Sequence, residues 1–247
     1  MTLKILLNGA QGRMGKAISQ IASQQNSEIV ATINRGDPIK EAIRQCDVVI
    51  DFSFHSATAP LAEQCVHFKK PLIIGTTGHQ PEEKAKILKT TASIPVVWAG
   101  NYSIGVNLLF YYTEQVAAKL GNDYHPEIIE MHHRHKKDAP SGTASDLLSG
   151  ILKARKMNQN QICYGRQGIT GERPDQQIGI HAVRGGDIIG EHTVLFAGSG
   201  ERFELTHRAT DRTIFAHGAI RAAHWANDKQ SGLYNMRDVL GLSKVID

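Results

Sequence analysis

Cysteine and long apolar runs are the two features of which this sequence has least. Its 247 residues include only 3 cysteines, Cys46, Cys65 and Cys163, and no two of them are close. An odd number of scattered cysteines argues against a disulfide framework or a thiolate zinc site and favours a reducing compartment. No apolar stretch approaches the roughly 18–20 residues that span a bilayer, and the apolar run near the N-terminus is too short for a signal peptide. We therefore expect a cytoplasmic protein with no membrane partner.

A large excess of one charge is also absent. The sequence has 28 Lys and Arg against 24 Asp and Glu, a net charge of +4, with 41% hydrophobic and 21% charged residues. This composition is ordinary for a globular protein, so the disordered, collagen-like and disulfide-rich classes are excluded. The mild positive charge does not indicate a nucleic-acid-binding face, but it is compatible with a pocket for a small anion. The length suits one large domain or two modest ones.

The first hundred residues alternate short apolar runs with helix-like segments. Strands are predicted at residues 5–7, 28–33, 47–52, 71–75 and 94–98, and helices at 16–22, 57–68 and 82–91. Continuously apolar runs are typical of parallel strands that are covered on both faces. Their repetition with helices at this spacing predicts right-handed βαβ units and a doubly wound parallel sheet of the α/β class.

The pattern changes after residue 103. The segments predicted there are, in order, a helix at 104–120, a strand at 128–131, a helix at 141–156, a glycine-rich loop at 163–174, strands at 178–183, 191–196 and 201–207, and a helix at 213–226. The last two strands are joined by Gly198-Ser199-Gly200, which is typical of a hairpin turn. Strands joined in this way belong to an antiparallel or mixed sheet, so we predict a second, α+β domain.

A glycine-rich turn joins the first strand to the first helix. Residues 9–15 read Gly-Ala-Gln-Gly-Arg-Met-Gly, a GxxGxxG pattern. Gly9 permits a tight turn, Gly12 lets the backbone approach a pyrophosphate, and Gly15 lets the helix pack closely on the sheet. Glycine turns also serve plain chain reversal, but the place of this turn favours dinucleotide binding.

The end of the second predicted strand bears on the choice of cofactor. Many NAD enzymes carry an acidic residue there that holds the adenosine ribose, whereas this strand continues as Asn34-Arg35-Gly36. Arg35 can pair with a 2′-phosphate, which favours NADPH over NADH. The alternative reading, a solvated loop arginine, stays open.

Two later turns follow strands of the same predicted sheet. They are Gly75-Thr76-Thr77-Gly78 and Ala99-Gly100-Asn101-Tyr102-Ser103. Each by itself is typical of an ordinary turn. Because both follow the carboxyl ends of strands, where dinucleotides bind, the two turns together with residues 9–15 predict one cofactor site.

The densest cluster of reactive side chains lies at residues 130–144. It reads Glu-Met-His-His-Arg-His-Lys-Lys-Asp-Ala-Pro-Ser-Gly-Thr-Ala, with three histidines, one arginine and two lysines in six consecutive positions. Ser141 is a predicted N-cap, and the helix that follows offers free N–H groups and a positive dipole end. Cations beside a helix N-terminus predict a receptor for a small dicarboxylate.

Three other interpretations of this cluster were weighed. A solvated basic loop is the usual fate of a charge run. A zinc site formed by His132, His133 and His135 is opposed by the neighbouring cations and lacks a completing ligand. Nucleic-acid binding would need aromatic stacking groups or a recognition helix, and neither interrupts the cluster.

Taken in order, these motifs resemble those of the dihydrodipicolinate reductase (4-hydroxy-tetrahydrodipicolinate reductase) family of bacterial lysine and diaminopimelate biosynthesis. The resemblance rests above all on residues 130–144 and also on residues 9–15, 75–78, 101–107, 184–187, 190–192 and 215–219. Tyr102 stands where the family often has phenylalanine, and the loop after the second strand is short.

The resemblance implies a Rossmann-like dinucleotide-binding domain at 1–103 and 214–247, and an inserted domain at 104–213 that binds substrate and forms a homotetramer. It implies reduction of 4-hydroxy-tetrahydrodipicolinate by NADH or NADPH, with no metal. His132 would be the proton donor or acceptor and Lys136 the proton donor, while His133, Gly142 and Thr143 would bind substrate. The implied cofactor contacts are Gly9, Ala10, Gln11, Gly12, Arg13, Met14, Arg35, Gly75, Thr76, Thr77, Ala99, Gly100, Asn101 and Tyr102.

The residues themselves are consistent with this chemistry. A histidine with a pKa near neutrality and a lysine among other cations are suitable proton donors to a substrate that has accepted a hydride. Two alternatives remain from the residues alone: a reductase of another small amino-acid-like carboxylate, and a dinucleotide-binding sensor without turnover.

Overall fold

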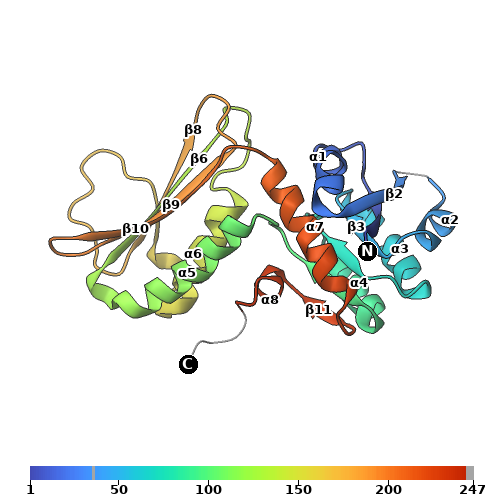
Figure 1. Cartoon of the computed structure of the whole chain (residues 1–247). Helices are drawn as coiled ribbons and strands as arrows, with labels where there is room; N and C mark the ends of the chain where they lie inside the picture. Colours follow the sequence, from blue (N-terminus) through green and yellow to red (C-terminus); the bar gives the residue numbers. More distant parts are fainter. Residues whose placement is uncertain (35–36, 243–247) are drawn as a thin grey trace. The chain divides into compact units, whose positions relative to one another are not determined.

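The computed structural model describes residues 1–34 and 37–242 and divides the chain into two compact units. Unit 1 comprises Met1–Ile104 and the segment that begins at Arg212, and unit 2 comprises Gly105–Asp211 (Figure 1). Within the described residues, no helix is long and apolar enough to cross a membrane.

Unit 1 is built on a six-stranded sheet in the order β11-β5-β4-β3-β1-β2. All neighbouring strands are parallel. The strands are β1 (Leu3–Asn8), β2 (Ser27–Ile33), β3 (Val48–Asp51), β4 (Leu72–Ile74), β5 (Pro95–Trp98) and β11 (Gly232–Tyr234). The doubly wound parallel sheet predicted from the apolar runs is therefore confirmed.

Helices cover both faces of this sheet. They are α1 (Arg13–Ile21), α2 (Ile39–Arg44), α3 (His55–His67), α4 (Pro81–Thr90), α7 (Thr213–Asn227) and α8 (Met236–Val239). Ile5, Ile50 and neighbours pack with α1 and α7 into one core, and the strand residues between them, such as Leu6 and Val49, pack with α3 into another. Burial on both faces explains why the strands are apolar throughout.

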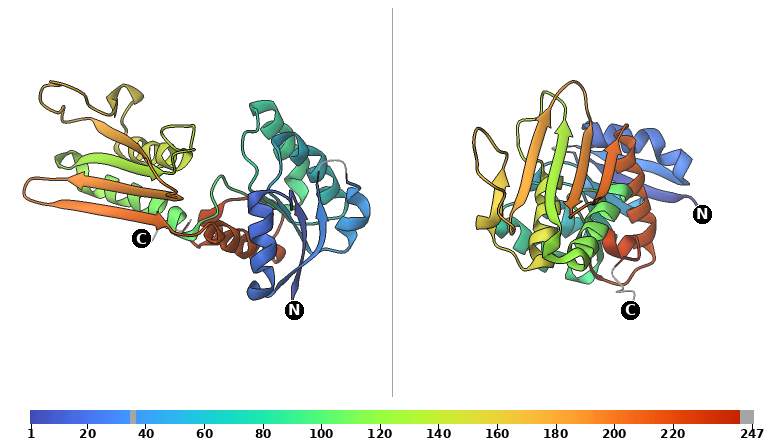
Figure 2. Two further views of the ribbon diagram at one scale, coloured as in Figure 1. Left: turned by 90° about the horizontal axis from the view of Figure 1, so that it is seen from above. Right: turned by 90° about the vertical axis from the view of Figure 1, so that its left-hand side faces the viewer.

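Unit 2 is built on a mixed five-stranded sheet in the order β10-β9-β6-β8-β7. Its strands are β6 (His125–His132), β7 (Ile162–Tyr164), β8 (Ile178–Arg184), β9 (Gly190–Ala197) and β10 (Arg202–Ala209). The long helices α5 (Ile104–Leu120) and α6 (Gly142–Arg155) pack on one face (Figure 2). The pairs β6–β8 and β7–β8 are parallel, whereas β6–β9 and β9–β10 are antiparallel. The predicted mixed sheet is confirmed.

The central strand β6 alternates strictly between its two faces. Ile128, Glu130 and His132 are buried on the face that packs against the helices, whereas Glu127 and Ile129 lie half-buried on the opposite face. Among the described residues, no helix covers that opposite face (Figure 2). Side chains three residues apart on this strand therefore enter different environments.

Among the α-helices and strands of the described residues, four short ones were not predicted. They are α2, β7, β11 and α8, each of three to six residues. β7 lies within the segment predicted as a loop, and β11 adds an edge strand to the sheet of unit 1 through its pairing with β5. Segments this short carry too few residues to show a periodic pattern.

Candidate functional site

The glycine-rich turn of unit 1 has the shape that its pattern predicts. Gly9 has φ +83°, its N–H donates to the carbonyl of Ile33 at 2.9 Å, and its own carbonyl accepts from the N–H of Gly12 at 3.0 Å. A Cβ on Gly9 would collide with the backbone of Phe52, and a Cβ on Gly15 would collide with the carbonyl of Gly9. The turn therefore requires glycine at these positions.

Helix α1 begins directly after this turn. Its N-cap is Gly12, no side chain caps it, and its first turn holds no acidic residue. The first N–H groups of the helix are thus left for a ligand, and the dipole favours a negative one. This arrangement fits the pyrophosphate of a dinucleotide.

A buried carboxylate connects the strand ends around this turn. Asp51, at the end of β3, accepts hydrogen bonds from Asn8 (2.8 Å), Ser53 (2.5 Å) and Thr58 (2.8 Å). The Thr76 hydroxyl accepts from the N–H of Ser53 at 2.9 Å. The loops that follow β1, β3 and β4 are therefore tied together. Sequence reasoning missed this role of Asp51, because the residue reads as part of an apolar strand.

Among the predicted cofactor residues that follow β5, Tyr102 has a buried side chain. The Tyr102 side chain is 1% exposed, and its hydroxyl lies 2.9 Å from the carbonyl oxygens of Ile74 and Val97. Burial raises the pKa of this hydroxyl well above its usual value. The Tyr102 ring therefore packs beneath the strand ends, and a cofactor can reach this position only through its backbone.

The end of β2 carries the predicted determinant of cofactor choice. Arg35 and Gly36 lie outside the described residues. The side-chain oxygen of Asn34 accepts from the backbone N–H of Gln11 at 3.3 Å, and the backbone N–H of Asn34 donates to the carboxylate of Asp37 at 2.8 Å. The carboxylate of Asp37 is thus engaged with the backbone.

In unit 2 the reactive cluster is organised around Glu130. Its side chain is fully buried and accepts four hydrogen bonds: from Nδ1 of His132 (2.6 Å), from Nη1 and Nη2 of Arg184 (2.8 and 2.7 Å), and from the N–H of Ser141 (3.0 Å). Burial alone would raise the pKa of Glu130, but the donors outweigh it and hold the pKa below its usual value. Glu130 is therefore an ionised carboxylate.

His132, the predicted proton donor or acceptor, is nearly buried at the end of β6. Burial lowers its pKa below the usual value, Lys136 and Arg184 lower it further, and Glu130 opposes both effects. Its ring lies 5.2 Å from that of His192, centroid to centroid. The turn after His132 is fixed by the N–H of Gly185, which donates to the His132 carbonyl at 2.9 Å.

The other predicted residues lie along the chain that runs from β6 to α6. Lys136 is half-buried and its Nζ lies 2.9 Å from the carboxylate of Asp138. Ser141 is the N-cap of α6, as predicted, and its hydroxyl accepts from the N–H of Ala144 at 3.2 Å. Gly142 and Thr143 form the first turn of the helix.

Two residues of this site were not assigned a role from the sequence. Arg184 binds Glu130, and Nε2 of His192 lies 3.0 Å from the hydroxyl of Ser141. Burial lowers the pKa of His192 to about 4, so this ring is neutral at working pH. Both positions lie in segments on which the family resemblance rested (184–187 and 190–192), and that was the only signal for them.

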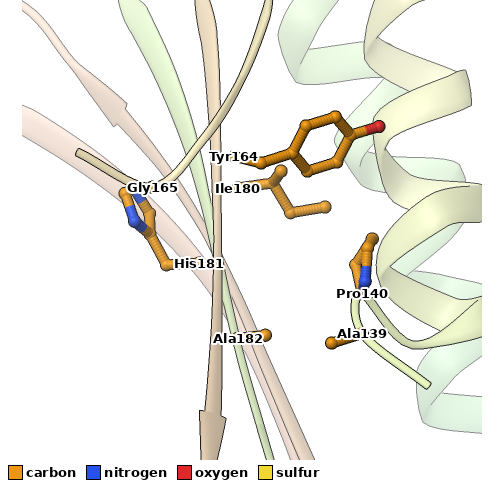
Figure 3. Close-up of a pocket in the computed structure, with 7 residues that line it drawn as sticks. All are labelled: Ala139, Pro140, Tyr164, Gly165, Ile180, His181 and Ala182. Carbon is orange, nitrogen blue, oxygen red and sulfur yellow. The ribbon is translucent and has the colours of Figure 1, made fainter. Parts of the chain in front are cut away.

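A cavity of about 370 Å³ lies at the edge of the same sheet, where β7 pairs with β8. It is lined by Ala139, Pro140, Tyr164, Gly165, Ile180, His181 and Ala182 (Figure 3). Tyr164 and Ile180 project toward the helices in this view. Its lining includes Ala139 and Pro140 of the segment 130–144, but neither His132 nor Lys136.

Comparison with known proteins covers nearly the whole chain. The family model described as "Dihydrodipicolinate reductase, N-terminus" matches residues 3–102, and the one described as "Dihydrodipicolinate reductase, C-terminus" matches residues 105–240. A 4-hydroxy-tetrahydrodipicolinate reductase of Akkermansia muciniphila is 48% identical over 247 residues, covering 98% of this chain and 100% of the relative. One from Geobacter sulfurreducens is 41% identical over 263 residues, with coverages of 97% and 99%.

Solved structures agree with these relatives. A dihydrodipicolinate reductase from Paenisporosarcina sp. TG-14, with dipicolinate bound, has a TM-score of 0.78 at 25% identity and covers 95% of this chain and 98% of its own. A probable dehydrogenase from Thermotoga maritima has a TM-score of 0.60 at 11% identity, covering 97% of this chain and 93% of its own, and that likeness concerns the fold alone.

Proposed function

The chain belongs to the dihydrodipicolinate reductase family, and from that premise we propose which of its residues bind the reactants and move the proton. The two family-model matches confirm the family that the motifs indicated. The chain is an oxidoreductase that reduces 4-hydroxy-tetrahydrodipicolinate to tetrahydrodipicolinate, a step of lysine and diaminopimelate biosynthesis, with a reduced nicotinamide dinucleotide.

Unit 1 binds the dinucleotide in this proposal. The glycine turn and the uncapped N-terminus of α1 fit its pyrophosphate. The loops tied by Asp51 and Thr76, together with residues 99–102, lie at the carboxyl ends of strands, where the nicotinamide half binds in this class of sheet. When bound, the reduced nicotinamide supplies the hydride.

NADPH is the favoured cofactor in this proposal. The carboxylate nearest in sequence to the end of β2, Asp37, is bonded to the N–H of Asn34, and Arg35 follows as a cation for a 2′-phosphate. Arg35→Ala should raise the Michaelis constant for NADPH by about tenfold, the value of one lost charge-assisted hydrogen bond, and leave that for NADH unchanged. Equal effects on the two cofactors would remove the assignment.

Unit 2 binds the dicarboxylate. The observation that carries this assignment is the bridge that Glu130 makes between His132 and the N–H of Ser141. Because Ser141 caps α6, the bridge places the imidazole beside the start of the helix, where Gly142 and Thr143 present N–H groups to a carboxylate. His133 and Lys136 supply further contacts.

Loss of the 4-hydroxyl group of the substrate as water gives a conjugated imine. Hydride addition to that imine leaves negative charge on the ring, which a proton must quench at the neighbouring carbon. Lys136 is the donor in this proposal, and the hydrogen bond to Asp138 orients its ammonium group. His132 donates or accepts a proton beside it. Burial lowers the pKa of its imidazole and the contact with Glu130 opposes that effect, so the ring has an environment for both its neutral and its protonated form. The N–H groups of α6 stabilise the carboxylates in place.

The uncovered face of the sheet in unit 2 supports the proposed homotetramer. Ile129, Val183 and Leu195 lie on this face, and Val183 is 44% exposed. An apolar sheet face of this kind is typical of a subunit interface. A mass of about four chains by light scattering would support it, and a monomer at all concentrations would refute it.

The three free cysteines agree with the proposed cytoplasmic location.

The proposed function is tested by following nicotinamide absorbance while the preceding enzyme of the pathway supplies fresh substrate. We expect NADPH to be oxidised only when that substrate is formed. Oxidation with a different amino-acid-like carboxylate and none with this substrate would assign another reductase activity. Binding of NADPH without oxidation by any dicarboxylate would instead indicate a sensor.

A further inference from the structure

The orientation of the His132 ring is set by one short contact. Its Nδ1 lies 2.6 Å from Oε2 of Glu130, a residue with no solvent-exposed surface. On the other side, a Cβ built on Gly190 would come within 3.0 Å of Nε2. The absence of a side chain at Gly190 therefore leaves room around Nε2, while Nδ1 is enclosed.

The contact decides which nitrogen carries the hydrogen in neutral His132. An ionised carboxylate can only accept hydrogen bonds. Glu130 accepts from Arg184 and from the N–H of Ser141 as well, so it is held in the ionised form. Nδ1 of His132 must therefore be the donor, and the hydrogen that comes and goes must be the one on Nε2.

The geometry points to Glu130 as a positioning residue of the reductase reaction, one that fixes His132 in the Nδ1–H tautomer, stabilises its protonated form and so directs proton exchange to Nε2. This inference rests on the proposed role of His132 as proton donor or acceptor. A carboxylate that orients and polarises a histidine in this way is a known device of acid–base catalysis on unrelated folds.

Arg184 limits how strongly the charge of Glu130 stabilises protonated His132. Its two terminal nitrogens bind both oxygens of Glu130, and Nη2 also donates to the carbonyl of Asp138 at 2.7 Å. The bidentate pair offsets part of the negative charge that faces the imidazole. His132 is therefore stabilised as a cation without being locked in that form, which suits a group that must both give and take a proton.

The charged groups that face His132 come from four parts of the fold. Glu130 on β6 favours the imidazolium, whereas Lys136 in the turn and Arg184 at the end of β8 oppose it. His192 on β9 is neutral at working pH. Glu130 is thus the one acidic group among them, and its removal should lower the pKa of His132.

The same strand offers a matched control. Glu127 lies three residues before Glu130 and also binds a histidine, with its Oε2 2.8 Å from Nε2 of His181, together with Arg166 and Arg173. It lies on the opposite face of β6. Glu127→Gln therefore removes a carboxylate of the same kind from the same strand without touching His132.

The experiment is nitrogen NMR of the histidine rings in the full chain with NADPH, combined with pH profiles of turnover. In the unsubstituted chain, His132 should show the Nδ1–H tautomer. In Glu130→Gln the pKa of His132 should fall by about one pH unit or more, and kcat should fall by about 10-fold to 100-fold, with the limb of the pH profile that belongs to His132 moved to lower pH. Glu127→Gln should leave the pKa and this limb unchanged.

An Nε2–H tautomer in the unsubstituted chain would overturn the inference, and this measurement needs no variant to fold. An unchanged His132 pKa in folded Glu130→Gln would also overturn it. If Glu130→Gln does not fold, Glu130→Asp keeps the charge and should retain the tautomer while reducing kcat. Full turnover of His132→Asn would instead refute the proposed role of His132 and leave its ring assignment standing, so the two failures are distinguishable.

Discussion

Glu127 and Glu130 lie on opposite faces of β6 and bind side chains of the same types, but the partners belong to different parts of the fold. Glu130 binds a histidine, an arginine and a backbone N–H, and Glu127 binds a histidine and two arginines. Two partners of Glu130, His132 and Ser141, belong to the predicted cluster at 130–144, and the third, Arg184, joins them from the end of β8. Among the partners of Glu127, Arg166 and Arg173 belong to the glycine-rich loop that connects β7 to β8 and tie it to β6, and His181 lies on β8. The face of the strand therefore decides whether the carboxylate joins the proposed catalytic cluster or anchors a loop.

The two sites also differ in exposure. The Glu130 side chain is fully buried, whereas that of Glu127 is 14% exposed. Burial would raise the pKa of Glu127, but hydrogen bonds from Arg166, His181 and Arg173 outweigh it and lower the pKa to about 2. Burying an ionised carboxylate costs free energy unless hydrogen bonds replace its contacts with water. The four donors around Glu130 supply these bonds, and they also fix the orientation of its side chain.

The largest expected effect is a loss of turnover in the cluster beside Glu130. Lys136→Ala should reduce kcat by about 10²-fold to 10⁴-fold, the range of general acid catalysis, while the dissociation constant for NADPH stays the same. Lys137, which is adjacent and exposed, provides the control, and Lys137→Ala should keep nearly full turnover. Steady-state kinetics and fluorescence titration of NADPH measure both. Surviving turnover in Lys136→Ala would leave this lysine only a structural or solvation role.

Stability should separate the two glutamates next. Glu130→Ala leaves Arg184 and His132 without their acceptor in a buried site and should cost about 3–5 kcal/mol of unfolding free energy. Glu127→Ala, at a partly exposed site, should cost about 1–3 kcal/mol. Urea titrations of the two variants compare these values directly. Equal losses would show that the face of the strand does not set the energetic difference.

Gly179 lies beside Glu127, and its substitution should have a smaller effect, on stability rather than on turnover. A Cβ on Gly179 would overlap the carboxylate of Glu127, so Gly179→Ala should displace that carboxylate and lower the unfolding free energy by about 1–3 kcal/mol. The loop at 165–177 should become more susceptible to protease, while kcat changes little. Gly185→Ala meets no atom within 4 Å and serves as the control for stability. A fully stable Gly179→Ala would contradict the role given to Glu127.

The smallest effect expected is the pH dependence of stability on the loop side. Because the pKa of Glu127 is lowered from 4.5 to about 2 in the folded chain, its stabilising contribution is complete above the unfolded value and is lost as pH falls through the folded value. The stability difference between the unsubstituted chain and Glu127→Gln should therefore narrow between about pH 5 and pH 2. Unfolding by urea at several pH values measures it, and a difference that does not vary with pH would contradict the ion cluster.

Much of this comparison could be predicted from the sequence, but its key contacts could not. The longer strands and helices of both units follow from apolar periodicity, and the cluster at 130–144 is visible as a local run. The pairing of Glu130 with Arg184 joins residues 54 positions apart, and the Asp51 network joins three separate strand ends. No local pattern encodes such contacts, because they depend on which strands become neighbours in the sheet.

The central claim is that the dicarboxylate binds on the buried side of β6, beside His132 and the start of α6. A crystal structure of the chain with NADPH and dipicolinate tests it most directly. We expect one carboxylate on the N–H groups of Gly142 and Thr143, with His133 and Lys136 in contact with the ring or its carboxylates. Dipicolinate in the cavity lined by Tyr164 and Ile180, or against the Glu127 cluster, would contradict it.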